Sequence, residues 1–112
     1  MYHNGEFVEK NRKKVIYHLE EASIGGLPDA RYDLGVEEGN DGRSERARKH
    51  LIIAAKQGHD GALNVVKDNF RRGFVSKEDF EAALRGHQAA VDATKSSQRE
   101  KAYSYAVFNL NN

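Results

Sequence analysis

Apolar and small residues recur at three- and four-residue steps through the second half of the chain, as is typical of amphipathic helices. Three such stripes are separated by glycines, and each has the length of a short helix rather than of a strand. Their members are Ala47, Leu51, Ala54, Ala55 and Gly58; Ala62, Leu63, Val66 and Phe70; and Phe80, Ala83, Leu84, His87 and Val91. We therefore expect three helices here, the second ending near Gly73 and the third beginning after Ser76.

The first half of the chain is less regular. A helical stripe over residues 15–23 ends at a pair of glycines. After Pro28, apolar and polar residues alternate as far as Glu37, which taken alone indicates a β-strand. A single strand would have no partner in the chain, however, and a proline followed by Asp29 suits the first turn of a helix. We favour a helix, and the fold class we expect is all-α.

A segment of the first half recurs in the second half at an offset of 32 residues. The positions aligned at this offset are residues 18–26 with 50–58, Ala30 with Ala62 and Leu34 with Val66. A weaker echo, outside this offset, links residues 2–5 with 70–73. Periods between about 20 and 50 residues are typical of stacked supersecondary units, here one helix hairpin per unit. Such units need neighbours, because a single hairpin has only half of a core.

These repeats resemble the Sel-one-like repeat family, which is related to the tetratricopeptide repeat. The matching residues are Ala54–Gly58, Ala62, Val66 and 70–75 in one unit, Ala22–Gly26, Ala30, Leu34 and Gly35 in the unit before it, and 2–8 in the tail of a still earlier unit. The resemblance implies antiparallel helix-hairpin repeats stacked as a short right-handed α-solenoid. It also implies a groove for a protein or peptide partner and no chemistry of the domain's own, since members of this family typically serve as adaptors.

The repeats predict a single helical-repeat domain over residues 1–112. Its expected parts are a partial repeat tail (1–13), a first repeat (14–42), a second repeat (43–75), a third leading helix (76–95) and a C-terminal capping segment (96–112). For the last segment a helix is favoured over a β-prone tail. A further interpretation is that the chain is a fragment of a longer array, whose unpaired first helix would cause marginal stability or self-association.

Several positions depart from the family pattern. Glu38 stands where an aromatic ring is expected, and Lys67 replaces the glycine that Gly35 retains in the first unit. Ile52 and Ile53 replace residues that are usually polar. Either the third helix or the C-terminal segment covers this pair, or the pair contacts a partner, since exposed apolar patches usually mark interfaces. Ile52 and Ile53 are therefore the candidate partner-binding residues.

Composition narrows the function classes further. The 112 residues include no cysteine, which excludes disulfides, thiolate zinc sites and thiol nucleophiles. The formal charge is +1, so no strong field attracts nucleic acid or anionic lipid. The longest apolar run, residues 51–55, is far shorter than the roughly 20 residues that cross a membrane, and residues 1–6 hold no apolar signal core. We expect a cytoplasmic protein without a membrane partner.

The titratable residues do not predict catalysis, a cofactor or a metal site. The 5 histidines lack His-x-x-x-His spacing, and His18 and His50 share one repeat position, which indicates packing. The neighbouring acidic residues Glu20 and Glu21, like Glu37 and Glu38, point about 100° apart on a helix, so we interpret both pairs as solvated surface. The glycine clusters lack the lysine that follows in a phosphate-binding loop.

Two basic clusters, residues 10–14 and 46–49, keep a nucleic-acid-binding domain open as an alternative function. Glutamates lie beside both clusters, which favours solvated helix faces instead. The function that we expect is therefore a non-enzymatic protein-interaction module, an adaptor or scaffold, with self-association as one form of partner.

Overall fold

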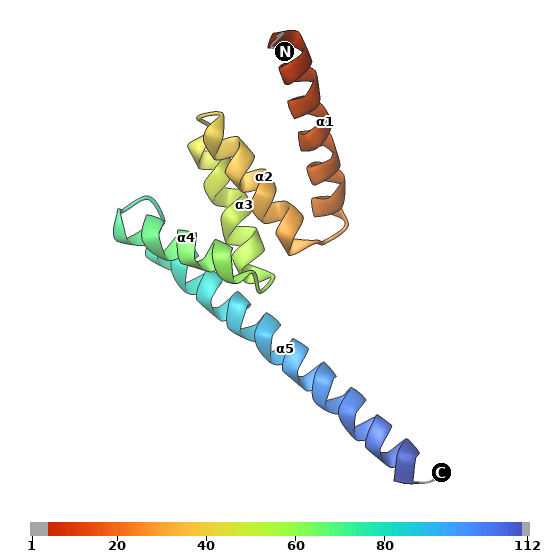
Figure 1. Ribbon diagram of the computed structural model, residues 1–112. Helices are drawn as coiled ribbons and strands as arrows, with labels where there is room; N and C mark the ends of the chain where they lie inside the picture. Colours follow the sequence, from red (N-terminus) through yellow and green to blue (C-terminus); the bar gives the residue numbers. More distant parts are fainter. Residues whose placement is uncertain (1–4, 111–112) are drawn as a thin grey trace.

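The computed structural model describes residues 5–110, with side chains from Glu9 onward, and this part of the chain is helical apart from its turns (Figure 1). The helices are α1 (Gly5–Ile24), α2 (Pro28–Asn40), α3 (Ser44–Lys56), α4 (Asp60–Arg71) and α5 (Lys77–Leu110). The all-α expectation is confirmed, and the alternating segment after Pro28 is a helix. No helix within residues 5–110 combines the length and the apolar character that a membrane span requires.

Each turn between successive helices contains a glycine in the left-handed backbone region. These are Gly26, Gly42, Gly58 and Gly73, with φ between 82° and 99°. A residue with a Cβ is strained at such angles, so glycine there ends a helix at little cost. Pro28 occupies the start of α2, where its missing N–H is not needed. The glycines of the sequence therefore mark the actual turns.

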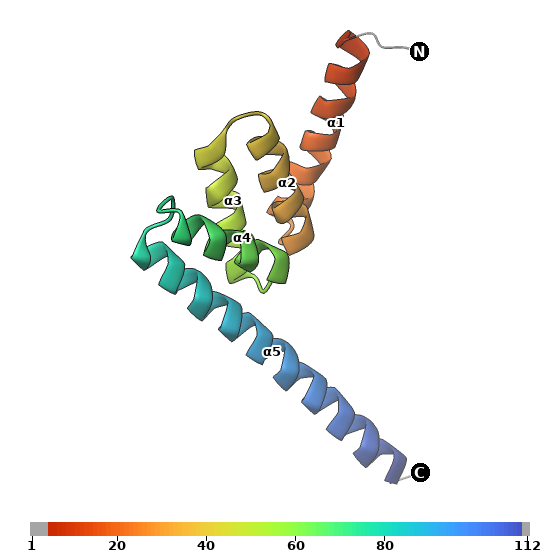
Figure 2. The same cartoon turned by 60° about the vertical axis from the view of Figure 1, so that its left-hand side comes forward.

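Helix α3 lies at the centre of the fold. Helices α2, α4 and α5 all pack against it, whereas α1 packs on α2 (Figures 1 and 2). The main core lies between α3, α4 and α5, and its buried members are Leu51, Ala54, Ala55, Ala62, Leu63, Val66, Val75 and Ala83. Phe70 of α4 stacks on Phe80 of α5 with ring centroids 4.2 Å apart. Tyr32 is the α2 side chain that packs against this core.

Glycines permit two of the close approaches to α3. A Cβ added to Gly35 of α2 would lie 3.1 Å from Cγ of Leu51, and one added to Gly86 of α5 would lie 2.9 Å from Cβ of Lys56. Both distances are shorter than an ordinary carbon–carbon contact of about 3.5–4.0 Å. The backbones of α2 and α5 therefore rest directly on α3.

The helix hairpins do not form a regular stack. Helices α3 and α5, which lead the second and third units, pack together, but α1 does not pack comparably on α3. A cleft instead separates α1 from the turn between α2 and α3. The helical-repeat character is thus present, while a right-handed solenoid arrangement is not confirmed.

Two of the expected segment boundaries do not coincide with the end of a helix. Helix α1 begins at Gly5, which the repeat alignment pairs with the turn residue Gly73, and it continues through residues 13 and 14. Residues 2–4, on which the earliest repeat match also rests, lie outside the described residues. Helix α5 likewise runs without a break through residues 95 and 96.

The C-terminal segment is helical, as favoured, but it does not cap the last hairpin. Side chains from Asp92 to Leu110 are all exposed, and this half of α5 projects away from the other helices (Figure 2). The projection contributes to an elongated outline of 64 × 39 × 21 Å. The expected capping function of residues 96–112 is therefore not supported by the described residues.

The approach of α5 to α3 can be tested with a pair of glycine variants. Alanine normally stabilises a helix interior by about 1 kcal/mol relative to glycine. We expect Gly86→Ala to lower the free energy of unfolding by about 1–3 kcal/mol, because the new Cβ would press on the backbone of Lys56. Gly39→Ala is the control, since its Cβ would lie 3.7 Å from Ala47 in ordinary contact. Urea denaturation followed by circular dichroism measures both, and a stabilised Gly86→Ala protein would contradict the packing described.

Candidate functional site

The candidate partner-binding residues Ile52 and Ile53 lie on different sides of α3, because neighbours on a helix point about 100° apart. Ile52 is half-buried, packs against the core and lines a hollow with Val75 and Asp79. This placement matches the interpretation in which the third helix covers it. Ile53 is 37 % exposed. The two residues therefore do not form one patch, and Ile53 alone stays a candidate contact.

A larger apolar surface lies at the end of α5, which the sequence analysis did not single out as a site. We define the α5 tip as residues 102–110. Its large apolar side chains and their exposed fractions are Tyr103 (73 %), Tyr105 (71 %), Val107 (36 %), Phe108 (65 %) and Leu110 (85 %). Tyr103, Val107 and Leu110 share one side of the helix at spacings of four and three residues. The spacing of these three residues, within the segment 96–112 that was expected to cap the fold, is the feature of the sequence that could have indicated this surface.

Glu38 corrects the prediction that the acidic pairs are solvated. Its side chain is 3 % exposed, and its two carboxylate oxygens each lie 3.2 Å from an arginine, Arg43 and Arg46. Both arginines are more than half exposed, so the pair network is open to water on one side. The buried carboxylate thus fastens the end of α2 to the start of α3.

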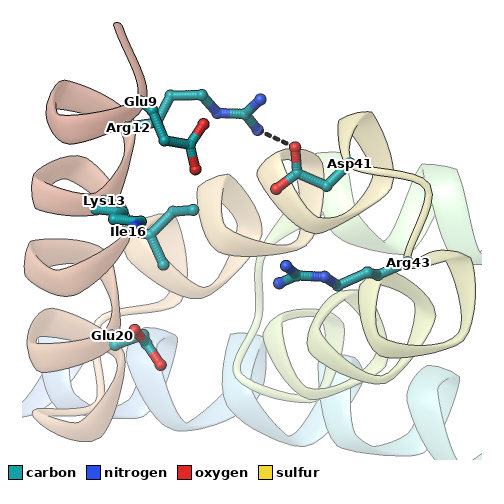
Figure 3. A pocket seen from close by; sticks show the side chains of 7 residues that line it. All are labelled: Glu9, Arg12, Lys13, Ile16, Glu20, Asp41 and Arg43. Carbon is teal, nitrogen blue, oxygen red and sulfur yellow. Dashed lines mark ion pairs between the residues drawn. The ribbon is translucent and has the colours of Figure 1, made fainter. Parts of the chain in front are cut away.

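Glu37 faces the opposite neighbour, helix α1. Arg12 of α1 lies 3.2 Å from Glu37 and also pairs with Asp41 at the end of α2, as Figure 3 shows for the Arg12–Asp41 contact. These residues border a cleft of about 280 Å³ between α1 and the α2–α3 turn, lined by Glu9, Arg12, Lys13, Ile16, Glu20, Asp41 and Arg43. Opposite charges within this lining neutralise one another, so the cleft favours neither an anion nor a cation.

His50 of α3 contacts Arg31 of α2. Nη1 of Arg31 is 3.3 Å from its Nδ1, and because arginine can only donate, Nδ1 is the acceptor. Burial, and next the Arg31 charge, lower the pKa of His50 below its usual 6.5. The unfolded chain has the usual pKa, so the stability that neutral His50 contributes is present above about pH 6.5 and is lost as the pH falls toward the lower folded-state pKa. His18, at the same repeat position, is exposed.

Side chains cap the starts of α4 and α5, whereas α2 and α3 have no side-chain cap. Ser76 does cap α5, with its hydroxyl oxygen accepting from the Asp79 N–H at 3.1 Å. His59 caps α4 through its ring, which the sequence analysis missed. The feature of the sequence that accompanies this cap is Gly61, two residues later, because a Cβ at this position would lie only 2.9 Å from Cε1 of His59.

The histidines were also compared with the requirements of a metal site. Among the side chains of residues 9–110, no group of three or more histidine and acidic residues is placed to share a metal ion. His59 and His87 each pair with one aspartate, Asp29 at 3.1 Å and Asp60 at 2.7 Å. These pairs join neighbouring helices, which is a structural arrangement.

Comparison with protein-family models, with curated proteins and with solved structures finds no match.

The ion network of Glu38 can be tested against its neighbour Glu37. We expect Glu38→Gln to lower the free energy of unfolding by about 1–3 kcal/mol, because it removes the charge from two charge-assisted contacts. Glu37→Gln should cost less than about 1 kcal/mol, since Glu37 is half-buried and Arg12 keeps Asp41. Both residues are near the end of α2, so effects of the helix dipole cancel in the comparison. If urea denaturation gave the same loss of unfolding free energy for both variants, the contacts of Glu38 with the two arginines would not stabilise the fold more than those of Glu37.

Proposed function

We propose that the chain is a non-enzymatic protein-interaction module, built from hairpins of the Sel-one-like type, that binds a protein partner through the α5 tip. The observation that carries the proposal is the exposure of five large apolar side chains on a helix that leaves the rest of the fold. Large apolar groups gathered on the surface of a protein usually mark an interface. The repeat character of α1–α4 supports the scaffold part of the proposal.

The length of the projecting helix adds a second argument. Residues 92–110 extend α5 by roughly 28 Å at 1.5 Å per residue. A helix of this length is only marginally stable in water without packing, and the α5 tip contains several residues of low helix propensity, among them tyrosine, valine and phenylalanine. A partner that covers the tip would supply the missing packing.

The geometry of the α5 tip favours a helical or grooved apolar surface on the partner. Tyr103, Val107 and Leu110 form a narrow stripe of the kind that inserts between the side chains of another helix. Tyr103 is the aromatic side chain of this stripe, whereas Tyr105 and Phe108 lie on the opposite side of the helix. Because a fully covered aromatic residue buries about 200 Å², the exposed part of Tyr103 would contribute roughly 150 Å² to the contact. A partner of the stripe would therefore cover one side of the tip.

The charge distribution does not favour the nucleic-acid alternative. Arg12, Arg43 and Arg46 contact carboxylates, and Lys49 lies 3.8 Å from Glu45. Nucleic-acid surfaces instead gather basic side chains on one face without such pairing. Lys10, Lys13 and Lys14 of α1 are exposed, but they belong to one short segment.

Site-specific photocrosslinking tests the proposal for a partner of any identity. A photoreactive phenylalanine analogue is placed in the full chain at Tyr103, and at exposed Ser97 as the control on the same helix. We expect protease-sensitive adducts, resistant to nucleases, from position 103 and few from position 97. Val107→Glu should reduce the adducts of position 103 at least fivefold, because a carboxylate would be buried in an apolar contact.

Two outcomes of the crosslinking would contradict the proposal. Nuclease-sensitive adducts would indicate a nucleic-acid partner, and equal yields at both positions would indicate non-specific contact. Adducts of twice the mass of the chain would identify a second copy as the partner.

A further inference from the structure

The ring of His59 joins three parts of the fold at the turn between α3 and α4. Its Nδ1 accepts from the Ala62 N–H at 2.9 Å, in the first turn of α4. Its Nε2 lies 3.1 Å from Oδ1 of Asp29, and its face stacks on Tyr32 with centroids 4.5 Å apart and planes inclined by 14°. Asp29 and Tyr32 both belong to α2, so one ring links α2 to the start of α4.

These contacts fix the tautomer of the neutral ring. Because Nδ1 accepts from a backbone N–H, the single proton of the neutral ring is on Nε2, which lies 3.1 Å from the Asp29 carboxylate. A second proton would have to enter at Nδ1, where it would face the Ala62 N–H. Two donors would then oppose each other, and the cap of α4 would be lost.

The surroundings leave the ring little freedom to avoid this conflict. The His59 side chain is 18 % exposed. A Cβ at Gly61 would lie 2.9 Å from its Cε1, which shows how closely the ring rests on the first turn of α4. With Tyr32 on its face, a protonated ring must move as a whole to find a new partner.

The charged groups around the ring come from α2, α4 and α5. Asp29 of α2 favours a positive ring, but it is 94 % exposed, so water screens its charge. The positive end of the α4 dipole opposes protonation. Asp60 of α4 is already paired with His87 of α5 at 2.7 Å.

Near His59, Tyr32 of α2 packs against the main core of α3, α4 and α5, which α2 also meets where Gly35 rests on Leu51. Displacement of the His59 ring would remove the stacking partner of Tyr32 and the contact of Asp29 together. Helix α2 would keep its packing on α3 and lose its link to the start of α4.

We propose that His59 is a proton-operated latch between α2 and the N-terminus of α4, closed while the imidazole is neutral and opened when a proton binds Nδ1. This inference goes beyond the proposed interaction function and does not depend on it. The latch makes the contact between α2 and the start of α4 depend on the protonation of one ring, while α2 stays packed on α3.

Nuclear magnetic resonance of the full chain tests the latch directly. The titration of the His59 ring is followed between pH 7.5 and 5.5, together with the protection factor of the Ala62 amide and the Tyr32 ring resonances. As the pH is lowered, we expect the protection factor of the Ala62 amide, corrected for the intrinsic exchange rate, to fall about fivefold. The size of this fall corresponds to the loss of one side-chain cap. Its midpoint should be the same as that of the ring titration. The Tyr32 resonances should shift with the same midpoint.

The chain offers both an internal control and a matched variant. The Asp79 amide is capped by the Ser76 hydroxyl, which does not titrate, so its protection should stay constant. In His59→Asn the side-chain oxygen keeps a cap without a titrating group, while His50 and His87 remain, so Ala62 protection should become independent of pH. The proposal would be overturned if the His59 ring titrated while the protection factor of the Ala62 amide stayed constant. It would also be overturned if Ala62 protection fell equally in acid in His59→Asn. The first of these outcomes can be observed with the unaltered protein.

Discussion

The close approach of α2, α4 and α5 to helix α3 holds this fold together. Three helices can reach one central helix only if the residues at the crossings are small, because the distance between helix axes grows with the side chains between them. Ala54, Ala55 and Ala62 are completely buried, and Gly86 brings α5 against the backbone of Lys56. A chain of this size buries only about two-thirds of its unfolded surface, so these few contacts carry much of the stability.

The two repeat units attach their following helix by different chemistry at the same position. Phe70 of the second unit stacks on Phe80 of α5, whereas its equivalent at the offset of 32 residues, Glu38, binds Arg43 and Arg46 at the start of α3. A stacked aromatic pair keeps its contact at any pH. A carboxylate needs its arginines and its charge. The leading helix of the first unit, α1, lies beside a charged cleft and packs on α2.

The elements of the fold were predictable from the sequence, and the contacts between them were less so. Glycine positions and three- and four-residue spacing located the turns and the helices, because both features are local. The isolated proline also decided correctly between helix and strand at residues 28–40. The continuity of α5 was missed, because the expected parts of the fold were divided at residue 95, whereas the helix continues through this point to Leu110.

The sites were harder to predict, because burial depends on the tertiary arrangement. Glu38 was interpreted as solvated from its acidic neighbour, although its position in the repeat pattern, where an aromatic ring is expected, indicated a buried side chain. Ile52 and Ile53 drew attention as a pair, yet a helix separates neighbouring side chains, and only Ile53 is exposed. His59 was missed, because a ring that caps a helix leaves no periodic pattern.

Native-state hydrogen exchange of the unaltered protein, at a concentration where it is monomeric, tests the central position of α3 most directly. Amides of α3, of α4 and of α5 up to residue 91 should exchange slowest and at similar rates, because they open only with the main core. Amides of α1 and of residues 92–110 should exchange faster by more than tenfold after correction for intrinsic rates. Protection that is uniform along α5 to residue 110, or as strong in α1 as in α3, would show that α3 is not the centre of the stable core.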